Sequence, residues 1–561
     1  MTLTPQQHDL NAPAKTGAEL LVQALVAEGV EYIFGVPGGA ILPILDVLAD
    51  GGPEFILCRD ETGAAFMAQA YGRITSRPGV VITTSGPGLI NAVCGVATAH
   101  EDRDPLVIIT GHVSQRMQLR PTHMNLDTAA LFKPITKWSV EIEDADTIPE
   151  AICNAFRLAA TDQKGAVHLS IPVNISTASV THHPLPKAPP PPQGAASPLL
   201  LSAIAKRLES AERPTILLGV RAGTPRVAEA VRRFMSKCKL PAVMTFEAAG
   251  TLSRDHLSQF AGRVGYIKNQ PGDALLTGAD LVLTIGYDAV EYDPTEWLNG
   301  SAARVIHLDS IPAVIDTFYQ PEMEVIGDIA LNLDHLAATL KKDFTDPRSD
   351  VALAREALVH EQSRGESLDG FPIHPLRFIH ALRNCLDDDI TVTCDVGAHE
   401  IWMARYFFCY QPRHLLFSMG HQTMGVAMPW AITAALVRKD HKSISVSGDG
   451  SFMMTVMELE TAVRLRLNTI HIIWVDQAYN LIESLQNRQF GRHFGCRFGP
   501  IDFVGLAEAL GAIGLRITAA SEIERVLQAA LAAKGPVVIE VPIDYSDNVE
   551  LVATLEASAL H

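Results

Sequence analysis

The stretch "SISVSGDGSFMMTVMELETAV" at residues 443–463 holds an aspartate, Asp449, between two glycines where a strand-like run gives way to a helical pattern. Gly448 and Gly450 allow the backbone to turn tightly and to approach a ligand closely. Asp449 therefore stands at the predicted carboxyl end of a strand, which is where α/β folds bind their ligands. The stretch predicts a strand–turn–helix unit with a ligand site, and a metal ion is one candidate ligand.

A second carboxylate follows the next predicted strand. Asp476 stands 27 residues after Asp449, at the end of the apolar run in "IHIIWVDQAYN" (470–480). In a strand–helix–strand unit both strands end at the same edge of the sheet, so we expect the two carboxylates to lie close together. Mg²⁺ commonly binds one or two carboxylates together with phosphate oxygens, and glycine N–H groups and a helix N-terminus would hold the phosphates. The alternative is two unrelated loop aspartates.

Strand-like apolar runs alternate with helical patterns along the whole chain. Examples of the runs are "EYIFGVPGG" (31–39), "GVVITTSGPG" (79–88), "PTILLGV" (214–220), "ADLVLTIG" (279–286) and "ITVTCDVG" (390–397). Continuous runs rich in β-branched residues are typical of parallel strands that are buried on both faces. The pattern predicts three doubly wound α/β domains, each with a parallel sheet.

Two segments read as linkers between these domains. "HHPLPKAPPPPQGAASP" (182–198) is rich in proline, which favours an extended and fairly stiff spacer. Residues 341–375 are polar, helical in their middle, and end in a glycine and proline break. We predict domains at residues 1–183, 199–342 and 366–561, each of an ordinary domain size.

Composition excludes several classes of protein. The chain has 561 residues, 47% of them hydrophobic and 19% charged, which permits large cores and argues against disorder. The net charge of −18 argues against nucleic-acid binding. None of the eight cysteines forms a CxxC motif, so we expect buried, reduced thiols. We expect no signal peptide at the N-terminus and no membrane span, and hence a cytoplasmic protein.

Taken together, these motifs resemble those of the thiamine diphosphate (ThDP) enzymes. "GDG" followed after the next strand by Asp or Asn resembles their cofactor motif, and "CRDETGAAFMAQAYGR" (58–73) is similar to their pyrimidine-domain signature, with its glutamate at Glu61. Across essentially the whole chain, several stretches are similar to the catabolic acetolactate synthases: "FGVPGG", "TSGPGLINAV", "NLDTAALFKPITKW", "FAGRVGYIKNQPGD", "HQTMGVAMPWAI" and "GDGSFMMTVMELETAVRL".

The resemblance implies an order of domains and an assembly. The first predicted domain would bind the pyrimidine of the cofactor, the second would be the central domain, and the third would bind the diphosphate and Mg²⁺. In the family the cofactor spans two subunits, so we expect a homodimer or homotetramer with the active site at the subunit interface. Residues 260–294 resemble the branch without flavin, so we predict no FAD.

The resemblance also assigns roles in catalysis. Glu61 would hydrogen-bond N1′ of the aminopyrimidine. From the residues alone, Glu61 could instead be a surface residue paired with Arg59 or Arg73. Met424 matches the bulky residue that holds the cofactor in its bent form, and His123 could donate a proton.

The remaining candidate residues follow the family pattern. The predicted metal ligands are Asp449, Asp476 and the backbone carbonyl of Ala478. The predicted cofactor contacts are Thr84, Pro87, Asn91, Gly397, Ala398, His399, Gln422, Met424, Gly448, Asp449, Gly450, Ser451 and Tyr479. The predicted substrate pocket contains Gly38, Met124, Ile482 and Leu485.

Two positions depart from the synthases. The acetolactate synthases carry Gln where this chain has Met124, and Gln or Trp where this chain has Leu485. Both changes make the pocket more apolar, which favours a larger 2-oxo acid substrate or a simple decarboxylase. The His-His pair of pyruvate decarboxylases is absent from the first domain, since the only such pair, at 182–183, lies in the linker.

Three functions therefore remain open. The leading prediction is an acetolactate synthase that converts two pyruvates to 2-acetolactate and CO₂. The alternative is a non-ligating decarboxylase that acts on larger, branched or apolar 2-oxo acids and releases aldehydes. The third is a catalytically idle regulatory homologue, and the intact Glu61, Asp449 and Asp476 argue against it.

Overall fold

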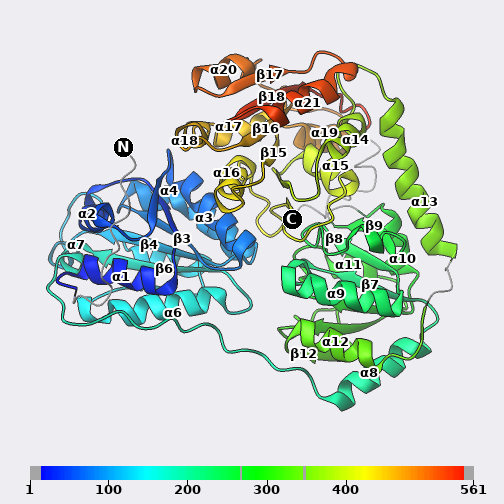
Figure 1. Cartoon of the computed structure of the whole chain (residues 1–561), viewed down its shortest axis with the longest axis horizontal. Coiled ribbons are helices and arrows are strands. Elements are labelled where there is room, and N and C mark those ends of the chain that lie inside the picture. The colour runs from blue at the N-terminus through cyan, green and yellow to red at the C-terminus, as the bar shows by residue number, and fades with distance from the viewer. Residues whose placement is uncertain (1–13, 266–267, 345–348, 549–561) are drawn as a thin grey trace. The chain divides into compact units, whose positions relative to one another are not determined.

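The computed structural model describes residues 14–265, 268–344 and 349–548, in which three six-stranded sheets follow one another along the chain (Figure 1). Every strand pair within the three sheets is parallel. The predicted fold class of three doubly wound α/β domains is confirmed. The domain limits 1–183, 199–342 and 366–561 stay predictions, and the residues 1–13 on which the signal-peptide expectation rests lie outside the described part.

The first domain has the strand order β2-β1-β3-β4-β6-β5. Its strands are β1 (Tyr32–Gly35), β2 (Glu54–Leu57), β3 (Gly79–Thr83), β4 (Leu106–His112), β5 (Ser139–Glu141) and β6 (Ala166–Pro172). Its helices are α1 (Gly17–Glu28), α2 (Leu42–Asp50), α3 (Glu61–Thr75), α4 (Pro87–Glu101), α5 (Thr128–Phe132), α6 (Ile148–Ala160) and α7 (Val173–Ser176). Figure 1 shows α1 and α6 on one face of this sheet and α3 and α4 on the other.

Local chemistry determines where the two helices that carry candidate residues begin. The side chain of Asp60 caps α3 by accepting the N–H of Thr62 at 2.8 Å. Helix α4 begins at Pro87, whose missing N–H and fixed φ suit the first helical position. Both starts follow directly after strand ends, so they bring the first turns of α3 and α4 to the carboxyl edge of the sheet.

The second domain has the strand order β12-β11-β10-β7-β8-β9. Its strands are β7 (Pro214–Leu218), β8 (Ala242–Thr245), β9 (Phe260–Val264), β10 (Leu281–Ile285), β11 (Arg304–Asp309) and β12 (Met323–Ile326). Helices α8 (Pro198–Ser210), α9 (Pro225–Cys238) and α12 (Ile329–Thr339) pack on one face of the sheet. Helices α10 (Pro271–Thr277), α11 (Pro294–Leu298) and α13 (Ser349–Arg364) pack on the other.

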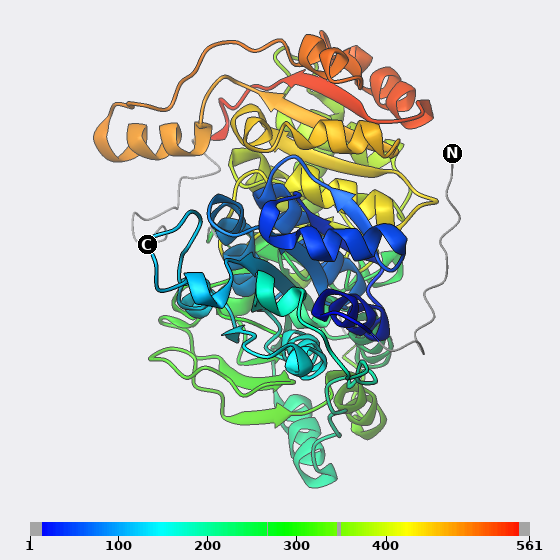
Figure 2. The same cartoon turned by 90° about the vertical axis from the view of Figure 1, so that its left-hand side faces the viewer.

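The third domain has the strand order β14-β13-β15-β16-β18-β17. Its strands are β13 (Thr391–Cys394), β14 (Leu415–Leu416), β15 (Ser443–Gly448), β16 (Thr469–Val475), β17 (Ile513–Arg516) and β18 (Val537–Pro542). Its helices are α14 (Pro375–Cys385), α15 (Ala398–Tyr406), α16 (Ala427–Val437), α17 (Asp449–Met454), α18 (Glu458–Arg464), α19 (Asn480–Phe490), α20 (Phe503–Ala509) and α21 (Ile523–Ala532). In Figure 2, α19 (orange) and the segment after it extend away from this sheet.

Packing groups the chain into two compact units. The first joins Met1–Pro191 with Gly420–Arg438 and Thr455–Leu467, and the second holds the rest. Helices α16 and α18, although they belong to the third domain in sequence, therefore pack with the first domain. The Thr433 hydroxyl in α16 donates to the carbonyl of Met67 at 3.1 Å, and the Arg73 guanidinium stacks 4.8 Å from the centre of the Trp430 ring.

The cysteines and the linkers agree only in part with expectation. All eight cysteines are free, but only five are buried, since Cys153 and Cys385 are half-buried and Cys94 is exposed on α4. The proline-rich segment 182–197 forms neither helix nor strand, and α13 is the helix expected within residues 341–375. None of the helices in the described part of the chain combines the length and the apolar character that crossing a bilayer requires.

Candidate cofactor-binding site

Glu61 is the first residue of α3, and its side chain is buried against the start of α4. It is 8% exposed, and the amide of Asn91 donates to its Oε2 at 3.0 Å. Gly88 is the second residue of α4, and a Cβ there would lie 2.8 Å from Glu61 Oε1. The glycine therefore permits a close approach of α4 that an alanine would prevent.

The alternative interpretation of Glu61 as a surface residue in an ion pair is wrong. Arg73 is buried and contacts Asp104 at 2.8 Å and Asp102 at 3.2 Å. Arg59 is 3.9 Å from Glu460. Glu61 is 8% exposed, and its carboxylate accepts the amide of Asn91.

The turn before Glu61 is held by a second glutamate, Glu458, which is fully buried in α18. Its Oε1 accepts the backbone N–H groups of Arg59 at 3.0 Å and Asp60 at 3.1 Å. Burial raises the pKa of the Glu458 carboxyl. A Cβ on Gly63 would lie 2.5 Å from Oε1, so glycine is required where α3 passes this carboxylate. Glu458 thus fixes the backbone immediately before Glu61.

Several predicted pocket residues lie at the same edge of the first sheet. Thr84 follows β3 and accepts the N–H of Ala40 at 3.3 Å, and a Cβ on Gly38 would lie 2.4 Å from the Cβ of Thr84. Gly86 has φ +67°, and a Cβ there would lie 3.0 Å from the Cβ of Met124. Met124 itself has φ +61° and is 41% exposed, and the neighbouring His123 is also exposed.

The loop before α16 is attached to the end of α4. The carboxylate of Asp102 accepts the N–H groups of Gly420 at 2.8 Å and His421 at 3.2 Å. This loop carries two predicted cofactor contacts: Gln422, which is exposed with φ +49°, and Met424, which is half-buried. Both therefore belong to the first compact unit together with Glu61.

In the second unit, Asp449 and Asp476 lie at adjacent strand ends. Strands β15 and β16 are paired with Gly448 opposite Trp474, so the residue after each strand stands at the same edge. Asp449 Oδ2 accepts the N–H of Asp476 at 3.2 Å and that of Gln477 at 2.7 Å. The two aspartates predicted from their spacing are thus brought together by direct hydrogen bonds.

The surroundings of the two carboxylates suit a divalent cation. Burial and the charge of Asp449 raise the pKa of Asp476 to about 7, because two carboxylates in one buried place repel each other. A cation between them would relieve this repulsion. Within the described ranges no group of three or more His, Cys, Asp or Glu side chains forms a metal cluster. A metal here would therefore take its remaining ligands from backbone, water or phosphate oxygens, as Mg²⁺ does.

Backbone N–H groups beside this pair suit a phosphate. Ala398 begins α15 after Gly397, whose φ is +152°. The buried His399 accepts the N–H of Gly448 at 3.3 Å, and burial lowers its pKa to about 3, so the ring is neutral. The Ser451 hydroxyl donates to the carbonyl of Gly448 at 3.1 Å. The start of the nine-residue helix α15, whose first turn also carries the acidic Glu400, is a candidate anion site.

The remaining predicted residues follow β16. Tyr479 stacks edge-on with Phe498 at 5.3 Å, and a Cβ on Gly450 would lie 2.5 Å from its ring. Ala478 is buried beside it. On α19, Ile482 is 48% exposed, whereas Leu485, one turn later, packs partly against the core of the third domain.

Sequence reasoning missed Glu458 and two asparagines, Asn480 and Asn548. The amide of Asn480 donates to Asp476 Oδ2 at 2.8 Å, and the amide of Asn548 donates to Asn480 Oδ1 at 2.6 Å. Glu458 left one weak signal, an acidic residue between the apolar Met457 and Leu459. The asparagines left none, because amides are common at helix starts and chain ends.

Known sequence families match all three domains. The N-terminal TPP binding domain of thiamine pyrophosphate enzymes matches residues 15–131, their central domain matches 201–336, and their C-terminal TPP binding domain matches 395–541. Thiamine pyrophosphate is another name for ThDP. The three matches follow the order of the three sheets.

Curated relatives are similar over nearly their whole length. The chain is 46% identical over 540 residues to an acetolactate synthase of Bacillus subtilis (strain 168), which covers 95% of this chain and 94% of that protein. It is 40% identical over 550 residues to a catabolic acetolactate synthase of Raoultella terrigena, with 97% and 98% covered. It is 32% identical over 550 residues to the large subunit of acetolactate synthase isozyme 2 of Escherichia coli (strain K12), with 95% and 96% covered.

The Glu458 contact predicts a cost to stability. Glu458→Ala leaves two part-buried N–H groups without this acceptor, and we expect the free energy of unfolding to fall by about 1–3 kcal/mol in total, measured by urea denaturation. Glu458→Gln retains a carbonyl acceptor and is expected to lose much less. Glu460→Ala on the same helix, at a half-buried position, serves as the control. A loss for Glu458→Ala no larger than for this control would contradict the role.

Proposed function

The chain belongs to the thiamine pyrophosphate enzymes. From this premise we propose that it decarboxylates a 2-oxo acid and joins the remaining fragment to a second 2-oxo acid molecule. The specific reaction is that of an acetolactate synthase, which converts two pyruvates to 2-acetolactate and CO₂. The main support is the hydrogen-bonded pair of Asp449 and Asp476 at the edge of the third sheet, in a chain similar throughout to acetolactate synthases.

Glu61 is the proposed acid–base residue. When bound, ThDP supplies a nucleophilic carbon and an electron sink for the loss of CO₂ from a 2-oxo acid. Glu61 shares a proton with a ring nitrogen of the aminopyrimidine, for which its remaining carboxylate oxygen is suited because Asn91 occupies the other. Glu458 keeps the preceding turn in place, and Met424 supports the bent cofactor.

Asp449 and Asp476, with the carbonyl of Ala478, are the proposed Mg²⁺ ligands. Their burial and mutual repulsion favour a cation. The proposed diphosphate contacts are Gly397, Ala398, His399 and Ser451, at the starts of α15 and α17. Further proposed cofactor contacts are Gly448, Gly450, Tyr479 and Gln422. Thr84, Pro87 and Asn91 are the proposed contacts on the pyrimidine side.

We propose a cytoplasmic homodimer or homotetramer with the active site at the subunit interface. The support is that large apolar side chains are exposed beside the candidate residues of each compact unit. Ile90 is 53% exposed next to Asn91, and Met454 and Ile482 are 45% and 48% exposed near Asp449 and Asp476. A second copy of the chain would cover such surfaces.

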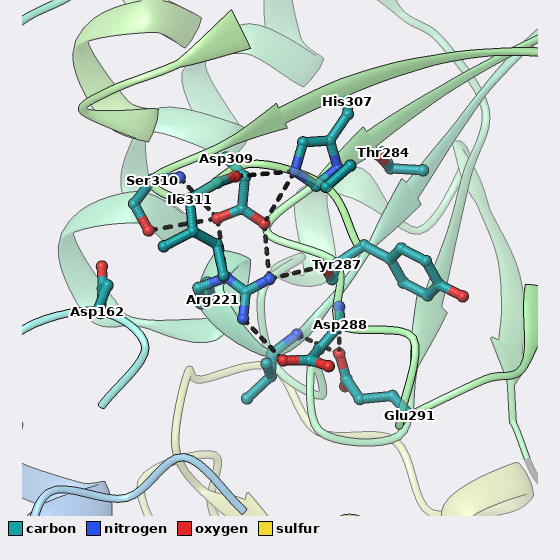
Figure 3. A network of polar contacts seen from close by, with 12 residues as sticks. Asp162, Arg221, Thr284, Tyr287, Asp288, Glu291, His307, Asp309, Ser310 and Ile311 are labelled. Atoms are coloured by element: carbon teal, nitrogen blue, oxygen red, sulfur yellow. Dashed lines mark hydrogen bonds and ion pairs between the residues drawn. The ribbon is translucent and has the colours of Figure 1, made fainter. Parts of the chain in front are cut away.

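We propose that the enzyme uses no FAD, and the central domain supports this. In its sheet the chain order reverses between β7 and β10, the point at which doubly wound sheets bind nucleotides. Figure 3 shows Arg221, which follows β7, held in this place by Asp309 at 2.8 and 2.7 Å and by Asp288 at 3.0 Å. The backbones also touch there, because the Arg221 N–H donates to the carbonyl of Gly286 at 3.0 Å.

A buried glutamate completes this network. Glu291 is 1% exposed; it accepts the N–H of Val220 at 2.8 Å and the hydroxyl of Thr245 at 2.5 Å, and burial raises the pKa of its carboxyl (Figure 3). We propose that these side chains fill the crevice in place of a flavin nucleotide. This filling is the physical reason for proposing a flavin-independent enzyme.

A non-ligating decarboxylase of larger 2-oxo acids is the second candidate. The apolar Met124, turned toward Gly86 by its positive φ, and the apolar Leu485 favour it. Neither side chain can donate a hydrogen bond to the carboxylate of an acceptor substrate. His123 is exposed beside Met124 and is the proposed proton donor for aldehyde release.

Glu61→Gln tests the assignment of the acid–base residue. The glutamine keeps the size and the carbonyl acceptor for Asn91, so we expect ThDP binding within about twofold of the parent. We expect CO₂ release from pyruvate to fall by about 100-fold or more, because a positioned acid or base contributes about that factor. Glu54→Gln, exposed on β2, is the control. Near-normal turnover in Glu61→Gln would refute the assignment.

Met124→Gln combined with Leu485→Gln tests the choice between the two reactions. A polar contact to a carboxylate is worth about 1.5–3 kcal/mol, so we expect the ratio of acetolactate to aldehyde to rise about tenfold or more. Products are measured after feeding pyruvate and a branched 2-oxo acid separately. If the parent forms only aldehyde, the synthase proposal fails, and an unchanged ratio means that these positions do not steer the reaction.

Arg221→Ala tests the filling of the central crevice. Removing one partner of a buried ion pair costs about 3–5 kcal/mol, which we expect as a loss in the free energy of unfolding in urea. Arg226→Ala breaks the exposed pair with Asp328 and is expected to cost about 0–1 kcal/mol. We also expect no flavin absorbance after denaturing the purified parent and no response of its turnover to added FAD. A response to FAD would overturn the proposal.

A further inference from the structure

Three side chains form a relay of hydrogen bonds that ends on Asp476. The indole Nε1–H of Trp402 donates to Asn548 Oδ1 at 2.7 Å. The Asn548 amide donates to Asn480 Oδ1 at 2.6 Å, and the Asn480 amide donates to Asp476 Oδ2 at 2.8 Å. Trp402 is 4% exposed and Asn548 is 3% exposed, so water does not compete for these groups at the start of the relay.

The two ends of the relay determine its direction. The oxygen and nitrogen of an asparagine amide have nearly the same shape, so contacts must decide which is which. An indole can only donate, so the oxygen of Asn548 must face Trp402, and its NH₂ group must then face the oxygen of Asn480. The NH₂ group of Asn480 is thereby turned toward Asp476, whose carboxylate, when ionised, can only accept.

The backbone brings the start of the relay to the metal candidates. Asn548 follows β18, and the N–H of Ile543 at the end of that strand donates to the carbonyl of Val475 at 3.1 Å, directly before Asp476. Trp402 lies on α15, where it stacks against His374 at 5.4 Å between ring centres. Segments that are far apart in the sequence therefore meet at one carboxylate.

The relay fixes the orientation of the Asp476 carboxylate, to which the backbone N–H of Ala478 also donates. Oδ2 is occupied by Asn480, while the backbone N–H of Asp476 is occupied by Asp449. We propose that Asn548 is a positioning residue for the cation site, which orients Asn480 so that Asp476 presents its carboxylate to the metal. This inference rests on the proposed metal binding by Asp449 and Asp476.

The physical reason is preorganisation. Without Asn548, nothing fixes which end of the Asn480 amide faces Asp476. In the flipped orientation the amide oxygen would face the carboxylate oxygen of Asp476, and the two would repel each other. The Ser484 hydroxyl, at 3.3 Å from Asn480 Oδ1, is a weaker and more distant donor. Loss of an outer hydrogen bond to a metal ligand typically lowers metal affinity by about 10–100-fold.

The experiment measures Mn²⁺ binding to the full chain in the presence of saturating ThDP, through the electron paramagnetic resonance signal of free Mn²⁺. We expect Asn548→Ala to raise the dissociation constant by about tenfold or more. Trp402→Phe keeps an aromatic ring and removes only the donor, so a smaller rise in the same direction is expected. Adding Trp402→Phe to Asn548→Ala should cause little further change, because both act through one relay.

The control and the contrary outcomes distinguish the positioning role of Asn548 from the proposed metal site itself. Asn487→Ala removes an exposed amide from the same helix α19 and should leave Mn²⁺ affinity unchanged. Unchanged affinity in both Asn548→Ala and Trp402→Phe, with binding by the parent, overturns the positioning role alone. If Asn548→Ala does not fold, Trp402→Phe decides. Failure of the parent to bind Mn²⁺ with ThDP overturns the proposed metal site, and this inference with it.

Discussion

The candidate site depends on one carboxylate that joins two strand ends. Asp449 follows β15 and accepts the N–H groups of Asp476 and Gln477, which follow β16. These hydrogen bonds require the second aspartate to sit beside the first, in a buried place where two negative charges repel each other. The two acidic side chains that the parallel sheet brings together therefore favour the binding of a cation. A phosphate-bearing ligand could supply that cation as its bound metal ion.

The fold and this pair could be predicted from sequence because both depend on short-range patterns. Buried parallel strands are continuous apolar runs, and a single strand–helix–strand unit sets the distance between Asp449 and Asp476. Glu458 could not be predicted in the same way. It holds backbone N–H groups of Arg59 and Asp60, which are 399 and 398 residues away in the chain. Backbone groups are the same at every residue, so such a contact leaves no mark on the sequence of its partner.

Polar side chains inside two domains illustrate the same limit. From the sequence, Arg221 is an ordinary arginine after a strand, yet Asp288 and Asp309, from the ends of two other strands, pair with it beside the point where the strand order reverses. Asn548 reads as a residue near a chain end, yet it orients Asn480 beside the third sheet. In both cases the function of the side chain is determined by which strand ends the fold brings together, and the residue type only makes the contact possible.

The turn "TSGPG" (84–88) lies between Glu61 and Met124 and contacts both. Gly88 lets α4 approach Glu61, and Gly86 lets Met124 pack against the same turn. Pro87 stands between them with a fixed φ at the first position of the helix. Glu61, the proposed acid–base residue, and Met124, proposed to lie in the substrate pocket, are thus separated by a rigid segment. On the proposed function, a change at Met124 would alter the choice of acceptor, while the position of Glu61 would remain determined by Asn91, Gly88 and the turn before α3.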